Sequence, residues 1–479
     1  MMKSIFKCEI RNLMGDGTVW TLAIIFALVL GYAVYNGQRW TEFQQGAIAQ
    51  AKEREEQNLV KVKKQAEAIL SGEEAAPAYW KNPADIRGFS YRGLVTHAYK
   101  PPTELTTMSV GQSDIYPYIF KMNTGLKNSF ISSYEIENPR RLLLGRFDPA
   151  FVVIYLFPLF ILALGYNVIS SEKEEGMLGL LLSQPVALSQ LVLGKMLLRV
   201  IVVFGLSFGL LTAALLVLGF NFSAPNVLSR LGLWFLVAAA YGAFWFSLIL
   251  LVNSRGWSSP VNATVLAGCW LILVVLLPGI INLAVKTVYP VPSRVEFITA
   301  LRDATDDVTS QRAKVISKYL EDHPELAPQD IPAEQLGFFE SRIITNEEIE
   351  QKLLPVQNRF ETQVMRQQDF VRRLKYVSPA LLAQDAFNNI SGTGLERQRQ
   401  FMDQVDQYHM ELRGYFHPKV LRGELKFTGF DEYPRYQFTE EPDKALAERT
   451  AWTLFGLAGP TFLIGVIGVL AFRRYPLAY

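Results

Sequence analysis

The chain has 479 residues, of which 50% are hydrophobic and only 19% are charged. Soluble proteins average about 25% charged residues, so this composition argues against an ordinary soluble protein. The 47 Lys and Arg nearly balance the 45 Asp and Glu. That balance argues against a nucleic-acid-binding protein, and two cysteines exclude a disulfide-rich secreted scaffold.

Six stretches of the chain are mostly apolar and have no charged residue near their middle. A bilayer core of about 30 Å is crossed by about 20 helical residues, so each stretch can span it. A buried helix of a soluble protein seldom stays apolar around its whole circumference for this length. We therefore predict a mainly α integral membrane protein with six transmembrane helices, at 17–38, 150–171, 191–220, 231–254, 257–285 and 450–472.

A cleaved signal peptide is the alternative for the first stretch. Basic residues precede it, and Ala47-Ile48-Ala49 resembles a cleavage site. The apolar run is longer than the about 7–15 residues of a signal core, and the triplet lies well beyond it. We therefore predict an uncleaved first span.

The orientation follows from basic residues in short segments, which collect on the cytoplasmic side. With a cytoplasmic N-terminus, the single short outer loop carries only Arg230. The tail 473–479 is then also cytoplasmic, and the long segments 39–149 and 286–449 lie outside, side by side. The basic residues on the inner side are Lys3, Lys7, Arg11, Lys173, Lys195, Arg199, Arg255, Arg473 and Arg474.

The first outer segment begins with a helical pattern. Apolar residues at 3–4 spacing cover 48–69 and are interrupted only by Glu55, so the first span is expected to continue out of the membrane as a helix. Short strands, such as one at 93–99, are expected after it.

The second outer segment is also expected to be mainly helical. Pro355 suits the first turn of a helix and precedes an apolar stripe over 356–374, in which Gln367 is the one polar member. A second stripe covers 401–415. We expect these stripes to pack against each other, with a partner surface or a cargo contact as the alternative. A hairpin or irregular cap is expected over 417–436.

The inner segment 172–190 combines a charged cluster with a short amphipathic helix. The cluster contains Glu172, Glu174, Glu175 and Gly176, and the helix that follows is broken at Pro185. A stiff helix across a cytoplasmic turn suits docking to a soluble partner. The alternative is a solvated charge cluster that only anchors the second span.

These residues carry a resemblance to a known family. The Glu-x-Glu-Glu-Gly cluster at 172–176, the Leu-Leu-Leu-Ser-x-Pro-Val run at 180–186 and Gly194-Lys195 resemble the permease subunits of type-2 ABC exporters (ABC-2 type). Motifs within 109–117, 138–148 and 289–294 resemble the subfamily with a large split extracytoplasmic region, an ABC permease domain of unknown function. Met177 is a departure, since the family usually has Thr there. The resemblance covers nearly the whole chain.

The resemblance implies a two-component machine in a bacterial inner membrane. Two permease chains, as a homodimer or with a sister permease, would form the pathway in the lipid, and each would dock an ABC ATP-binding subunit that holds ATP and Mg²⁺. Residues 1–16 would form an amphipathic connecting helix. The residues expected to couple the chain to the ATPase are Glu172, Glu174, Glu175, Gly176, Leu180 and Pro185.

The chain offers no motor of its own. Gly-x-x-x-x-Gly-Lys-Ser/Thr is absent, because Gly194-Lys195 is followed by Met196 and lacks the upstream glycine. We therefore expect no enzyme activity and no bound cofactor. An alternative to the exporter is a membrane-anchored structural protein that holds a periplasmic partner or transmits force to it, with little transport.

Two further site classes are disfavoured. His409 with Met402 and Met410 would suggest copper, but no zinc-type His-Glu-x-x-His spacing occurs, and we expect no metal. An ion-coupled carrier normally needs a charged residue well inside a span, and the predicted spans have none there. The nature of the cargo, whether lipidic, peptidic or drug-like, is left open.

Some residues are expected to break or kink the spans. They are Pro158, Pro278, Gly279 and Pro460. At Pro278-Gly279 the alternatives are a short re-entrant helix that faces outward and an ordinary kink.

Overall fold

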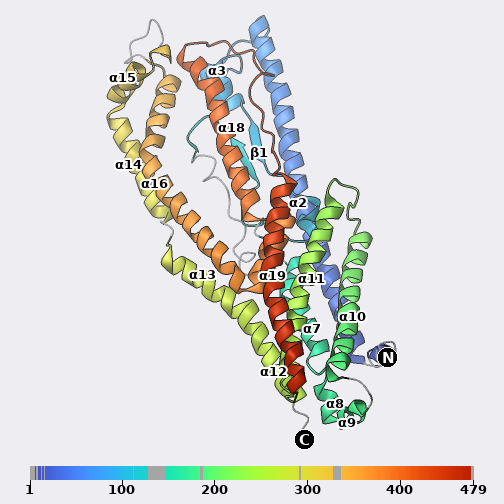
Figure 1. Cartoon of the computed structure of the whole chain (residues 1–479). Coiled ribbons are helices and arrows are strands. Elements are labelled where there is room, and N and C mark those ends of the chain that lie inside the picture. Colours follow the sequence, from blue (N-terminus) through green and yellow to red (C-terminus); the bar gives the residue numbers. More distant parts are fainter. Residues whose placement is uncertain are drawn as a thin grey trace.

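The computed structural model describes residues 17–111, 113–127, 147–183, 187–290, 293–326 and 336–475, with positions 6, 9–11, 13 and 15. The described chain is mainly α-helical, and one two-stranded sheet is found in it. Six helical runs are long and apolar enough to cross a membrane. They gather at one end of an elongated molecule, and a projecting domain occupies the other end (Figure 1).

The six runs form the helix bundle. The start of α2 and the end of α19 lie at the same end of the bundle, which also carries the short helices α8 and α9 (Figure 1); we name it the terminal end. The bundle elements are α2 (Gly17–Ser71), α6 (Pro149–Phe151) with η4 (Val152–Leu156) and α7 (Phe157–Gly165), α10 (Leu188–Val217), α11 (Val227–Asn253), α12 (Ser259–Trp270) with η5 (Leu271–Leu276) and α13 (Leu277–Val288), and α19 (Asp443–Ala471).

Several of the helices start earlier than the predicted spans. α19 begins at Asp443 rather than 450, and α11 begins at Val227 rather than 231. Hydropathy locates the part of a helix that fits the bilayer, whereas polar first turns extend the same helix beyond it.

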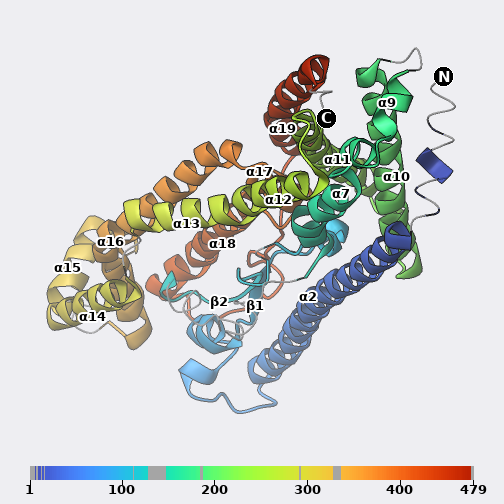
Figure 2. The ribbon, with the colours of Figure 1, turned by 90° about the horizontal axis from the view of Figure 1, so that it is seen from below.

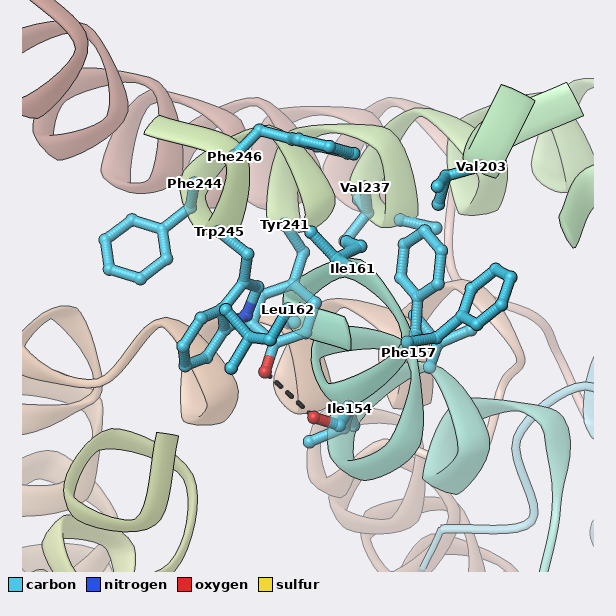
Figure 3. Close-up of a cluster of buried hydrophobic side chains, with 14 of the residues drawn as sticks. Ile154, Phe157, Ile161, Leu162, Val203, Val237, Tyr241, Phe244, Trp245 and Phe246 are labelled. Atoms are coloured by element: carbon cyan, nitrogen blue, oxygen red, sulfur yellow. Dashed lines mark hydrogen bonds between the residues drawn. The ribbon is translucent and has the colours of Figure 1, made fainter. Parts of the chain in front are cut away.

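Helix α11 lies at the centre of the bundle core. Its Trp234, Tyr241 and Trp245 are fully buried, although they are among the largest side chains of the chain. Figure 3 shows aromatic and aliphatic side chains of α11 facing Phe157 and Ile161 of α7 and Val203 of α10. In contrast, α10, the α12–α13 run and α19 bury few of the residues in their apolar windows. Their free apolar faces are suited to lipid or to another membrane chain.

Pro158 and Pro278 do not end their helices, so of the two expected alternatives, a break or a kink, the break does not occur. Each proline follows one turn of π-helix, η4 or η5, and the helix continues beyond it. Proline lacks an N–H, so a carbonyl in the preceding turn loses its partner. A π-turn shifts the register and absorbs the misfit.

Hydroxyl groups from other elements satisfy the carbonyls near these prolines. The carbonyl of Ile154 would pair with residue 158 in an α-helix, and it accepts a bond of 2.9 Å from the Tyr241 hydroxyl (Figure 3). The carbonyl of Leu273 would pair with residue 278 in π register, and it accepts a bond of 3.0 Å from the Ser378 hydroxyl. These spans therefore remain continuous, and no re-entrant helix forms at Gly279. α19 likewise continues through Pro460.

Replacing Tyr241 by Phe is expected to lower the free energy of unfolding by about 1–3 kcal/mol, because the Ile154 carbonyl loses its donor in a buried, apolar place. Thermal unfolding in lipid nanodiscs measures the effect. Tyr32→Phe is the matched control, since the Tyr32 side chain is 59% exposed. Equal stability of the two variants would contradict this role of Tyr241.

Helix α2 leaves the bundle and continues into the projecting domain, as predicted. It ends at Gly72, whose φ of +82° only glycine adopts at little cost. Glu55, which interrupts the apolar stripe, accepts bonds of 3.1 Å from the Thr96 hydroxyl and from the backbone N–H of His97. The polar residue in the stripe thus anchors strand β1 (Thr96–Tyr99), which pairs antiparallel with β2 (Ile119–Met122).

The segments 39–149 and 286–449 share one hydrophobic core, which confirms that they lie side by side. Val62 of α2, Phe89 and Phe120 from the first segment pack with Phe401 and Phe416 of α18 from the second. Residues 417–436 form no hairpin beyond the end of α18; an irregular chain packs Phe427, Phe430 and Tyr433 into the core. The remaining elements are η1 (Tyr79–Lys81), α3 (Ile86–Gly88), η2 (Phe89–Gly93), η3 (Glu104–Thr107), α14 (Arg294–Ser310), α15 (Arg312–Asp322), η6 (Pro324–Leu326), α16 (Phe338–Leu374), η8 (Lys375–Val377), α17 (Pro379–Ile390) and α18 (Leu395–Leu421).

Helix α16 corrects two predictions. Pro355 lies in the interior of this helix rather than in its first turn. Among the described residues, no member of the stripe over 356–374 joins the hydrophobic core that contains α18, and Phe360 is 41% exposed. The stripe lies beside α13 instead, where Gln367 donates a bond of 2.6 Å to the Tyr289 carbonyl. Figure 2 shows α13, α14, α15 and α16 extending together to one side, away from α2 and α10.

Candidate functional site

Two short helices at the terminal end contain most of the predicted coupling residues. α8 (Ser170–Glu174) and α9 (Met177–Leu182) follow the second span, and Gly176 joins them with φ of +72°. A Cβ at Gly176 would meet open space, so the turn requires glycine for its backbone conformation rather than for room. The side chain of Leu180 and the whole of Pro185 lie outside the described residues.

Glu172 belongs to a buried ion cluster. Its carboxylate accepts a short bond from Lys195, and Glu9 pairs with Arg199 at 2.9 Å and with Lys195 at 3.7 Å. All four side chains are at most 17% exposed. Two carboxylates therefore neutralise two cations in a place with little water, where each charge depends on the others.

The ion cluster joins three elements of the chain. Lys195 and Arg199 lie one turn apart on α10, Glu172 is on α8, and Glu9 precedes the first span. Arg199 also donates to the Leu164 carbonyl at the end of α7. Sequence analysis missed this cluster. The signal for it was two basic residues at i and i+4 on one face of an apolar helix.

Glu174 is exposed, and its carboxylate also bonds to another part of the chain. It accepts bonds of 2.6 Å from the Ser259 backbone N–H and 2.9 Å from the Ser259 hydroxyl, at the first turn of α12. A carboxylate at a helix N-terminus satisfies a free N–H and complements the helix dipole. Glu174 therefore holds α8 against the fifth span.

Lys173 extends these contacts to two further elements. Its ammonium group donates a bond of 3.1 Å to the Gly256 carbonyl, in the loop between α11 and α12. It also lies 5.9 Å from the ring centre of Tyr475, just after the last helix. Helix α8 thus makes polar or cation–π contacts with α10, α12, the loop after α11 and the chain end after α19.

The turn between α8 and α9 is exposed. Glu175 is exposed and has no ion pair or hydrogen bond among the described side chains, and Met177 is 48% exposed. Leu178, between Met177 and Gly179, is buried at 5%. Of the predicted carboxylates, Glu175 is exposed without a bond to the described side chains, whereas Glu174 is exposed but bonded to Ser259. We name Glu175, Gly176 and Met177 the exposed turn.

At the other end of the bundle, helix α17 connects the spans to the projecting domain. It belongs to the segment 286–449, which was predicted to lie outside the membrane, yet it packs against α11, α19 and η5. The ring of Phe387 lies 4.5 Å from that of Trp234 in α11. On its other side, Asn388 accepts a bond of 2.7 Å from the Ser109 hydroxyl, which is part of one predicted family motif. Sequence analysis placed this helix wholly outside the membrane-spanning bundle.

Two histidines in the projecting domain are structural. The Nε2–H groups of His409 and His417 donate bonds of 3.0 Å to the Gly125 and Thr124 carbonyls. Burial, with the nearby Arg413 guanidinium, lowers the pKa of His409 to about 4 and that of His417 to about 3. No group of three His, Cys, Asp or Glu that could hold a metal ion occurs among the described residues.

The pKa shifts of these histidines predict a loss of stability in acid. Between about pH 6.5 and pH 4 the unfolded chain takes up protons that the folded histidines do not, so folding weakens as the pH falls. His417→Asn should reduce the slope by up to about 1.4 kcal/mol per pH unit in that window. Thermal unfolding from pH 7.5 to 4.5 tests this, with His323→Asn as the control because its side chain is 44% exposed. Parallel curves for the wild type and His417→Asn would contradict the prediction.

Comparison with known proteins relates one part of the chain to a family. Residues 294–439 match a family described as a domain of unknown function, DUF3526. The match runs from the start of α14 through α18 and the irregular chain after it. No curated protein matches the chain.

Proposed function

We propose that this chain is the membrane permease subunit of an ATP-driven ABC-2 type exporter in a bacterial inner membrane. Both termini would be cytoplasmic, and the projecting domain would be periplasmic. ATP and Mg²⁺ would be held by a separate ATP-binding subunit, because the sequence lacks a phosphate-binding loop. The resemblance in sequence and the six spanning helices support this assignment.

The contacts of α8 support the proposed coupling. The exposed turn lies directly after a helix whose other side chains contact several spans through buried polar bonds. A force on Glu175 or Met177 would therefore act on α8, and through it on α10 and α12 together. This is the property that a subunit driven from the cytoplasm requires.

The connections between the bundle and the projecting domain suggest how a movement of the bundle would be transmitted. Bundle and projecting domain share α2, and α17 lies between them, so a shift of α11 against α17 would reach the periplasmic side. The core within one chain is filled by apolar side chains (Figure 3). The pathway for a substrate would therefore lie between two permease chains rather than inside one.

A mechanical transmitter without transport is the second candidate. The continuous helix α2 and the core shared by both outer segments favour it. The two functions differ in outcome, since an exporter moves a substrate into inverted vesicles on ATP addition, whereas a transmitter changes only the conformation of its projecting domain.

Substitutions in the exposed turn test the proposed coupling. Glu175→Lys and Met177→Asp should weaken binding of the ATP-binding subunit about tenfold each and reduce stimulated ATPase activity accordingly. Glu56→Lys, an exposed site on the projecting half of α2, is the matched control. Pull-down of the native complex gives the binding, and phosphate release gives the activity. Normal activity in both exposed-turn variants would remove this role.

A further inference from the structure

The projecting domain contains a cavity that the proposed function does not use. Its volume is about 450 Å³, within the usual range for small-molecule sites. It lies between η2, the turn after β2, the start of α16 and the end of α18, at the end of the molecule remote from the bundle (Figure 1). A ligand therefore reaches it from water rather than from the bilayer.

The cavity wall carries positive charge and no negative charge. Arg92 and Arg342 both line it, whereas no Asp or Glu among the described residues does. The guanidinium of Arg92 lies 4.8 Å from the ring centre of Trp80, and that of Arg342 lies 5.1 Å from the ring centre of Tyr91. Stacking on a ring holds a guanidinium in place and leaves the N–H groups at its edge available.

The carboxylates on the neighbouring elements are occupied by other groups. Glu340 lies 3.6 Å from Arg87, whose main partner is Asp85 at 2.8 Å. Glu350 holds Arg413. Neither Arg92 nor Arg342 has an ion pair among the described residues, so both can receive an anion.

The rest of the lining is apolar or neutral. Phe339, Ile343 and Val420 provide an apolar wall, and Asn123 and Asn346 add neutral polar groups. His417 also faces the cavity, and because burial keeps its pKa low it contributes no charge at neutral pH. Such a lining favours a molecule with an apolar body and an anionic head.

We propose that this cavity is a binding site for a small amphiphilic anion, whose carboxylate or phosphate pairs with Arg92 and Arg342 and whose apolar body lies against Phe339. Guanidinium groups bind both heads in a two-pronged geometry. The inference is independent of the ATP-driven motor, and it would hold for either candidate function.

A matched series of probes tests the site on the full chain in lipid nanodiscs. The probes are 4-phenylbutyrate, 4-phenylbutyl phosphate, 4-phenylbutanol and 4-phenylbutylammonium, which share one apolar body, and titration calorimetry is corrected with empty nanodiscs. At least one of the two anions should bind saturably, and at least about tenfold more tightly than the alcohol or the ammonium. The carboxylate and phosphate arms show which head is preferred. Absence of saturable anion binding, or equal binding of the alcohol, would overturn the proposal.

Variants connect the binding to the cavity. Arg92→Gln and Arg342→Gln should each weaken anion binding about tenfold, and Asn346→Asp, which adds a negative charge to the wall, should weaken it at least as much. Arg366→Gln, on the same helix as Arg342 but outside the cavity, should leave affinity unchanged. Unchanged affinity in all three cavity variants would place the bound anion elsewhere and refute the site.

Discussion

Replacing Lys195 by Met is expected to lower the free energy of unfolding by about 3–5 kcal/mol, the largest effect of any single substitution considered for the terminal end. The substitution leaves Glu9 and Glu172 buried with Arg199 as their only remaining cation in the cluster. An uncompensated charge in a place with little water is far more costly than the loss of an exposed ion pair.

A double-mutant cycle separates this electrostatic cause from a simple loss of packing. The variant Lys195→Met/Glu172→Gln removes one charge of each sign, so it should recover a substantial part of the lost stability. Lys61→Met, an exposed site on α2, serves as the control and should change the melting temperature little. Strictly additive effects of the two single substitutions would show that the charges do not depend on each other.

The second large effect is expected at the contact between α17 and the bundle. Phe387→Ala should cost about 3–5 kcal/mol, because the ring is fully buried against Trp234 and its removal leaves a cavity. Phe360→Ala is the matched control in the same segment 286–449, since Phe360 is 41% exposed. Denaturation in nanodiscs measures the free energy of unfolding of both variants. Equal losses would contradict the prediction that the buried ring contributes more.

Phe387→Ala also has a functional consequence that stability alone does not predict. In the proposed exporter, loosening α17 should leave binding of the ATP-binding subunit intact, because the exposed turn is at the opposite end of the bundle. Stimulated ATPase activity should become less dependent on substrate. A loss of subunit binding in this variant would indicate general misfolding instead.

The spans could be predicted because the bilayer acts on each residue locally. A charge in hydrocarbon is costly wherever the rest of the chain lies, so the charge-free runs mark the six helices without knowledge of any contact. The apolar stripe over 48–69 likewise predicted that the first helix continues. Its one polar member, Glu55, accepts a hydrogen bond from the His97 backbone N–H in β1.

The ion cluster could not be predicted in the same way, because its partners are distant in the chain. Glu9 and Arg199 are 190 positions apart, and no local pattern pairs them. Glu174 shows the same limit, since its bond to Ser259 converts an apparently solvated charge into a helix cap. The sequence pointed to this charged segment, but it could not show which of its carboxylates bond to other parts of the chain.

Pro355 shows why a local rule can fail. Proline inside a helix removes one backbone bond and crowds the carbonyl of the preceding turn, which normally ends the helix. Around Pro355 the surface of α16 is exposed, so water can satisfy the freed carbonyl of Gln351. In the bundle, water is excluded, and Tyr241 and Ser378 take over that role for the two spans that contain Pro158 and Pro278.

The length of the continuous helix α2 determines how far its tip moves when the helix tilts. Its 55 residues contain no proline and extend over about 80 Å, so it behaves as a stiff lever with its short arm in the lipid. The part of α2 beyond the predicted span, residues 39–71, is about 50 Å long, so a tilt of about 5° would displace its tip by about 4 Å. A small rearrangement of side chains in the bundle therefore causes a larger displacement of α2 at the far end of the projecting domain.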